Sequence, residues 1–150
     1  MSQSLCKIFL HIIFGTKNRE PYIDDTICGE LCSYLTTVLK NLDCDVIAIN
    51  APKNHIHTLC ELSKDITIPS LIEKMKTTTS RWIKTKGLKF RNFHWQGGYG
   101  VFSVSPSLIE SAKKYIFNQQ EHHRKKTFQD EFRQFLKKYG VKYDEKYVWD

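Results

Sequence analysis

Two short pairs of residues, His55 with His57 and Tyr115 with Gln119, have the types and spacing to perform chemistry. In a β-strand, residues i and i+2 point to the same face, so both imidazoles of the histidine pair can bind one divalent metal ion. In a helix, residues i and i+4 lie side by side, so the phenol of Tyr115 would adjoin the amide of Gln119. Two imidazoles, an amide oxygen and a phenol suffice to polarise a phosphodiester and attack it. The pattern predicts metal-dependent DNA strand transfer through a covalent phosphotyrosine.

Both motifs are short enough to arise by chance, so an interpretation as edge histidines and a core tyrosine stays open. Their context favours chemistry, because the histidines lie in a predicted strand and the tyrosine in a predicted helix. Two histidines would leave metal positions open, and Gln119 would supply a third ligand through its carbonyl oxygen. Mixed nitrogen and oxygen ligands are compatible with Mg²⁺ or Mn²⁺, although imidazoles alone also suit Zn²⁺. We expect Mg²⁺ or Mn²⁺, since phosphate chemistry uses hard, exchangeable cations.

The tyrosine requires activation, because an ordinary phenol has a pKa of about 10 and is almost fully protonated at neutral pH. A nearby divalent cation favours ionisation of the phenol and neutralises charge on the phosphate. A covalent phosphotyrosine keeps the energy of the phosphodiester, so the break can be rejoined without a nucleotide cofactor. The sequence holds no G-x-x-x-x-G-K-[ST] phosphate-binding loop, which agrees with an ATP-independent reaction.

The elements that must position these residues follow from apolar patterning. Strands are predicted at residues 8–14, 45–50, 55–62 and 101–105. Helices are predicted to open at Asp24, at Pro69, at Ser105-Pro106 and at Thr127, and the third of these is predicted to hold both Tyr115 and Gln119. The order β-α-β-β-α-β predicts an α+β fold with a ferredoxin-like or RRM-like antiparallel sheet, packed helices and a C-terminal catalytic helix.

Composition indicates one soluble domain spanning residues 1–150. The chain carries 41% apolar and 26% charged residues and a net charge of +7, which favours a polyanionic partner, nucleic acid or acidic membrane. No run approaches the ~20 apolar residues of a membrane span, and no signal peptide is recognisable, so we expect a cytoplasmic protein. Five cysteines without a C-x-x-C pair indicate buried free thiols rather than disulfides or a zinc knuckle.

A basic stretch at residues 74–91, with two tryptophans close by, suggests a groove for single-stranded DNA. A solvated helix face with two core tryptophans explains the stretch equally well. His122 and His123, which follow the tyrosine motif, would assist proton transfer or contact DNA. Alternatively, they only cap the helix and pack against it. The candidates for DNA contact are Lys84, Lys86, Lys89, Arg91, Trp95, His122, His123 and Arg124.

Several separated segments occur together and in order along nearly the whole chain: HIIFGTKNREP, NHIHTLCEL, SRWIK, WQGGYGVFSVS and YIFNQQEHHRKKTFQDEF. With the two pairs above, they resemble the single-tyrosine HUH transposases, small insertion-sequence enzymes that act on single-stranded DNA. Several motifs in the right order make this resemblance far more specific than a His-x-His alone.

The resemblance implies a role for each matched residue. His55 and His57 match the metal-binding pair, Gln119 the third ligand and Tyr115 the nucleophile. It further implies cleavage at element ends that leaves a 5′-phosphotyrosine and a free 3′-OH, recognition of subterminal hairpins, and a homodimer whose active sites are completed in trans. No membrane or nucleotide cofactor is implied.

Two other hypotheses remain. One is a domesticated relative that nicks repeated chromosomal hairpins, and the DNA flanking the gene would distinguish it from a mobile element. The other is a non-catalytic nucleic-acid-binding module on the same sheet. Such a module has no need of both the metal strand and the tyrosine helix.

Overall fold

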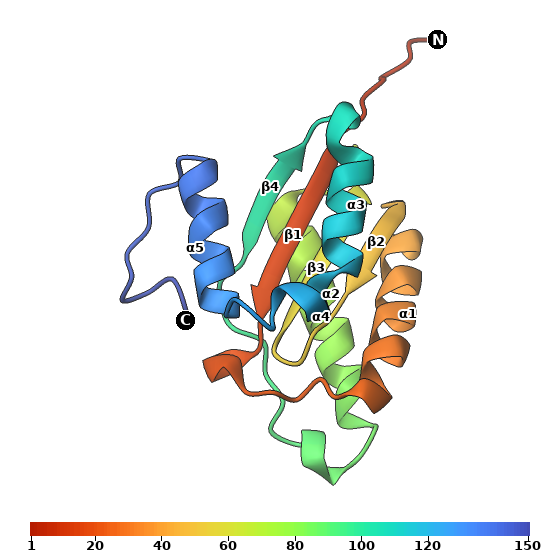
Figure 1. Ribbon diagram of the computed structural model, residues 1–150. Coiled ribbons are helices and arrows are strands. Elements are labelled where there is room, and N and C mark those ends of the chain that lie inside the picture. The colour runs from red at the N-terminus through yellow and green to blue at the C-terminus, as the bar shows by residue number, and fades with distance from the viewer.

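Four antiparallel strands form one sheet in the computed structural model, which describes residues 1–150 (Figure 1). The strands β1 (Phe9–Gly15), β2 (Val46–Asn50), β3 (His55–Glu61) and β4 (Gly100–Val104) lie in the order β2-β3-β1-β4. The α-helices are α1 (Asp25–Asn41), α2 (Ile68–Lys84), α3 (Ile109–Phe117), α4 (Gln119–His122) and α5 (Phe128–Lys138). Short 3-10 turns occupy Lys17–Arg19, Leu88–Phe90 and Pro106–Leu108. This arrangement confirms the predicted ferredoxin-like α+β class.

The central strand β1 is covered on both faces, as its continuous apolar run predicts. Leu10, Ile12 and Phe14 point into the larger core under α1 and α2. Between them His11 and Ile13 point to the opposite face, where α3 and α5 lie. Because successive side chains of a strand point to opposite faces, β1 contributes both to the larger core and to the face under α3 and α5.

Helices α1 and α2 lie against one face of the sheet (Figure 1). Each begins at a side-chain cap, since Asp24 accepts from the N–H groups of Thr26 and Ile27, and Thr67 accepts from that of Ser70. The first confirms the predicted opening at Asp24. Their apolar stripes complete a core of 19 buried residues.

The other face carries α3 and α5, which stand apart over the sheet (Figure 1). Helix α5 packs Phe128, Phe132 and Leu136 against Ile13 and Phe102. Helix α3 packs the buried Ile116, together with partly buried Ile109, Ala112 and Tyr115, against Ala48 and Leu59. Close approach of α5 depends on small residues, because a Cβ on Gly100 would lie 2.6 Å from the Phe132 ring. The strip of sheet between the two clusters carries the polar residues described below.

The predicted single helix from Ser105-Pro106 through Gln119 is wrong. Residues Pro106–Leu108 form a 3-10 turn, Ser105 makes no side-chain cap, and α3 ends at Phe117. A tertiary contact lies at the break at Asn118, where the Asn50 amide donates to the Ile116 carbonyl at 2.9 Å, an acceptor that a continuous helix would use for its own N–H. Tyr115 and Gln119 therefore belong to successive short helices rather than to one face of a single helix.

The remaining expectations concern the last helix, the thiols and the membrane. Helix α5 opens at Thr127, whose hydroxyl accepts from the Asp130 N–H at 3.2 Å, and Gly140 follows it at φ +66°. All five cysteines are free, with Cys44 and Cys60 buried and Cys6 exposed. None of the helices is long and apolar enough to cross a bilayer.

Candidate metal and nucleophile site

His55 and His57 project from the same face of β3, as the i, i+2 spacing predicts, and both are fully buried. Behind them, His11 on β1 contacts His57, with 2.8 Å between His11 Nε2 and His57 Nδ1. A bond at Nδ1 fixes the ring so that Nε2 points away from β1. His57 Nε2 is therefore the atom that faces the rest of the site.

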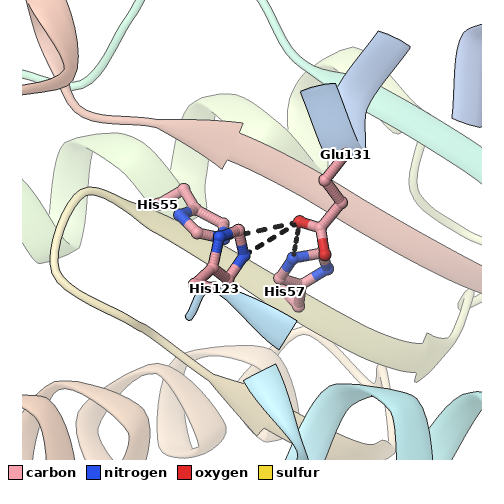
Figure 2. A group of neighbouring side chains, drawn as sticks. All are labelled: His55, His57, His123 and Glu131. Carbon is pink, nitrogen blue, oxygen red and sulfur yellow. Dashed lines mark hydrogen bonds and ion pairs between the residues drawn. The ribbon is translucent and has the colours of Figure 1, made fainter. Parts of the chain in front are cut away.

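Glu131, from the first turn of α5, reaches into the centre of the site (Figure 2). Its Oε1 lies 2.9 Å from His57 Nε2, 3.5 Å from His55 Nε2 and 3.3 Å from His123 Nε2. One ligand atom from each of these four residues lies within 4.8 Å of the others. Three imidazoles and a carboxylate therefore converge from β3, from the end of α4 and from α5.

Sequence reasoning did not identify Glu131, although a signal was present. The apolar stripe of α5 runs through Phe128, Phe132 and Leu136, and Glu131 falls on that same buried face. A carboxylate on the apolar face of an amphipathic helix is costly unless it is paired. That position alone marks Glu131 as a residue with a partner.

The protonation states of the site suit a cation. Burial lowers the pKa of His55 to about 4 against the opposing effect of Glu131, so this imidazole is neutral at pH 7. Burial alone would raise the pKa of the Glu131 carboxyl, but the neighbouring imidazoles of His123, His55 and His57 outweigh it and hold the pKa well below its usual range. Neutral imidazole and ionised carboxylate are the forms that bind metal.

His55 supplies the test of whether a metal fits. Its Nδ1 lies 2.8 Å from the Asn54 side-chain oxygen, which requires the proton on Nδ1 and leaves a lone pair on Nε2. That Nε2 is buried and has no hydrogen-bond partner, yet it faces the carboxylate oxygen of Glu131. A cation between the two atoms would satisfy both, so the residues fit a divalent metal.

Gln119 adjoins this group through His123. The Gln119 side-chain oxygen lies 2.9 Å from His123 Nε2, and the His123 Nδ1 lies 2.8 Å from the Lys126 carbonyl. Gln119 itself is fully buried. The structure thus puts His123 beside Glu131 and puts the predicted third ligand directly behind His123.

Tyr115 reaches the same carboxylate from α3. Its hydroxyl donates a hydrogen bond to Glu131 Oε2, the oxygen that does not contact the histidines. Burial, repulsion by the Glu131 charge and donation to it all raise the pKa of the phenol above its usual value. The His122 ring lies against the phenol, with ring centroids 4.6 Å apart. One carboxylate therefore joins a protonated tyrosine to the candidate metal ligands.

Two cavities border the group. One, of about 270 Å³, lies between α3 and α5 and is lined by Tyr115 and Glu131. The other, of about 460 Å³, is lined by His55 and His123 together with basic residues, namely Lys53, Arg124 and Lys126. Residues of the group therefore line two separate cavities.

The basic residues predicted from the stretch 74–91 lie elsewhere. Lys86 pairs with Glu30 at 3.3 Å and Lys89 pairs with Asp24 at 2.7 Å, both against α1 and its cap. Neither cavity is lined by any of the four predicted residues of this stretch, Lys84, Lys86, Lys89 and Arg91.

Trp95 does not offer the surface ring that a DNA contact needs. It is 8% exposed, packs in the main core, and donates from its indole N–H to Thr79 Oγ1 at 2.9 Å. Trp82 is half-buried and stacks on Tyr34, with ring centroids 4.9 Å apart. The interpretation as packing tryptophans fits both.

The family model described as "Transposase IS200 like" matches residues 4–119 of this chain. This range includes His55, His57, Tyr115 and Gln119, and it ends before Glu131. No curated protein matches the chain in sequence.

Two solved structures are similar in fold. A crystal structure of a candidate transposase from Deinococcus radiodurans R1 has a TM-score of 0.62 and 21% identity, over 79% of this chain and 98% of that one. A REP-associated tyrosine transposase bound to a REP hairpin has a TM-score of 0.61 and 16% identity, over 82% of this chain and 74% of that one.

Proposed function

The chain belongs to the IS200-like transposase family, and from that premise we propose that it cleaves and rejoins single-stranded DNA through a 5′-phosphotyrosine on Tyr115. One observation carries the proposal. Glu131 bonds the Tyr115 hydroxyl through one oxygen and contacts His57 Nε2 through the other at 2.9 Å. A phosphate bound beside this group would meet the nucleophile and the metal-binding residues together.

The metal would be held by His55 and His57 together with Glu131 and a fourth group. Either His123 or the predicted ligand Gln119 could be this fourth group, but not both in their present positions, because His123 Nε2 and the Gln119 side-chain oxygen bond each other at 2.9 Å. The position of His123 favours it, because its Nε2 faces Glu131 directly. Of the two expected cations, an imidazole-rich set favours Mn²⁺ over Mg²⁺. When bound, the cation neutralises charge on the phosphate oxygens.

The chemistry of the chain itself centres on the phenol. The Tyr115 oxygen attacks phosphorus, the bond to the 3′-oxygen breaks, and that oxygen takes up a proton to become a 3′-OH. The Tyr115 hydroxyl already donates to Glu131, which makes this carboxylate the first acceptor for the phenol proton. Attack by a 3′-OH on the phosphotyrosine reverses the sequence and joins strands without ATP.

The DNA partner is proposed to be single-stranded DNA with hairpins, which the hairpin-bound neighbour supports by analogy. The dimer with sites completed in trans is a separate proposal. Tyr115 lies beside Glu131 of its own chain, so one protomer already holds every proposed group. Mixing Tyr115→Phe with His57→Ala protein tests it, since shared sites restore cleavage and separate sites do not.

A covalent-adduct assay tests the function. The protein is incubated with Mn²⁺ or Mg²⁺ and single strands from both flanks of its gene, then run on a denaturing gel. We expect a slower protein–DNA band that is lost with chelator and in Tyr115→Phe. Tyr143→Phe, which removes the hydroxyl of an exposed tyrosine far along the chain, should keep the band. Tight hairpin binding without any band would instead indicate a DNA-binding or domesticated role.

A further inference from the structure

The cleavage chemistry proposed above does not use the 270 Å³ cavity between α3 and α5. Its floor is formed by Tyr115, Glu131 and His11, so anything lodged in it lies against the proposed nucleophile. Its volume is just below the range of small-molecule sites, which suits one ring system rather than a length of polymer.

The walls of this cavity are largely apolar and aromatic. They are formed by Val104, Leu108, Ala112, Phe135 and Tyr139. Leu108 is 53% exposed and Tyr139 is 39% exposed, so two large apolar side chains stand at the rim without a protein partner covering them. An uncovered apolar rim around a hollow is typical of a binding site.

The aromatic wall is held in place before any ligand arrives. The Tyr139 hydroxyl donates to the Ser103 carbonyl at 2.8 Å, and its ring packs on Phe102 with centroids 4.8 Å apart. Phe135 in turn stacks on Phe102 at 5.4 Å. A ring fixed in this way can stack on a flat ligand with little loss of side-chain entropy.

Polar groups occupy the remaining wall and mouth of the cavity, namely Ser111, Gln134 and Lys138. Lys138 is exposed and brings a positive charge to the rim. The one carboxylate that lines the cavity, Glu131, is buried and is already surrounded by imidazoles. Gln134 brings an amide that can both donate and accept. A cavity with aromatic walls and a lysine at its mouth is complementary to a base inside and a phosphate outside.

We propose that this cavity binds the nucleobase adjoining the scissile phosphate of single-stranded DNA. The proposal rests on the proposed function, since it is the attack by Tyr115 that gives the base its position. A base is tied to its phosphate through a single sugar, so a base stacked on Tyr139 holds that phosphate within reach of the phenol. Stacking tolerates any base, and Gln134 supplies the edge contact that selects among them.

The test measures the fluorescence of a base analogue in the DNA rather than cleavage. Single strands from the flanks of the gene carry 2-aminopurine at one position at a time, and Tyr115→Phe protein keeps them intact. We expect binding to quench the fluorescence several-fold at one position, because the base stacks on an aromatic wall. In active protein, that position should adjoin the nucleotide that forms the adduct.

Filling the cavity provides the matched variants. Ser111→Phe, on the exposed side of α3, should abolish the position-specific quench, whereas Ser33→Phe, exposed on α1 at the opposite face, should not. Gln134→Phe fills the cavity from α5 and keeps the test decisive if the first variant folds poorly. Circular dichroism checks the fold of each.

The outcomes separate this inference from the proposed function. An adduct with no position-specific quench, or with a quench unaffected by both filling variants, overturns the base site and leaves cleavage standing. A quench distant from the cleaved bond also overturns it. A position-specific quench that filling abolishes, without any adduct, supports base binding in the cavity and overturns cleavage.

Discussion

The two faces of the sheet are built for different purposes. Under α1 and α2, 19 buried residues form one continuous apolar core. Under α3 and α5 the apolar contacts divide into clusters of five and three, and His11, His57 and Glu131 lie between them. The first face can hold the fold, while the second gives up apolar packing to bury polar groups.

The same strands supply both faces, so the difference comes from alternation within each strand. On β3, Ile56 and Cys60 enter the large core, while His55 and His57 face the site. Buried polar groups cost stability unless each is paired, and here the imidazoles and the carboxylate pair with one another. Rigid strands, anchored by the apolar face, keep that group assembled.

The largest effect on stability is expected from a substitution in the apolar core. Leu35→Ala on α1 removes a fully buried side chain and should lower the free energy of unfolding by about 3 kcal/mol, through lost burial and the cavity left behind. Urea unfolding measures it. Metal affinity of the folded fraction should stay unchanged. A large loss of affinity would show that the two faces are energetically inseparable.

On the polar face, His57→Ala should abolish measurable metal binding by calorimetry, while His11→Phe should weaken it by about 10–100-fold. His11 lies behind His57 and would not contact a bound cation, so its expected effect comes from holding Nδ1 of His57 at 2.8 Å. His11→Asn restores an acceptor and should recover much of the affinity, whereas exposed His94→Phe serves as the control. Equal losses for His11→Phe and His11→Asn would contradict the orienting role.

How well the sequence predicts each face depends on how far apart along the chain the interacting residues lie. The strands, the helix openings at Asp24 and Thr127, and the His55–His57 pair depend on neighbours within a few residues, and all were predicted at nearly correct positions. The contribution of Glu131 was missed, because its partners lie 74 and 16 residues away in the chain. The helix break before Gln119 was also missed, and the Asn50 amide that bonds the Ile116 carbonyl at this break lies 66 residues away.

A smaller effect isolates the link between Glu131 and Tyr115, the proposed nucleophile. Glu131→Gln keeps the shape of the side chain but removes its charge, which is one cause of the raised pKa of Tyr115. The pKa of this phenol should therefore fall toward its ordinary value. NMR titration of tyrosines labelled at the phenolic carbon, without metal, follows it directly. Exposed Glu121→Gln should leave the Tyr115 titration unchanged.

The smallest expected effect is a pH dependence confined to the polar face. Burial lowers the pKa of His55 from 6.5 to about 4, so between these values the unfolded chain binds a proton that the folded chain does not. Stability should therefore fall as pH falls through this window. The depressed pKa of Glu131 adds a further loss below about pH 4.5, where the unfolded carboxyl is protonated first.

Urea unfolding in chelator at pH 7 and pH 5 measures this dependence. His55→Asn should reduce the difference between the two pH values, whereas His94→Asn, an exposed histidine, should not. If His55→Asn keeps the full difference, the acid sensitivity does not arise from His55. His11 would then be the next residue of the polar face to test, because burial also lowers its pKa well below the usual value.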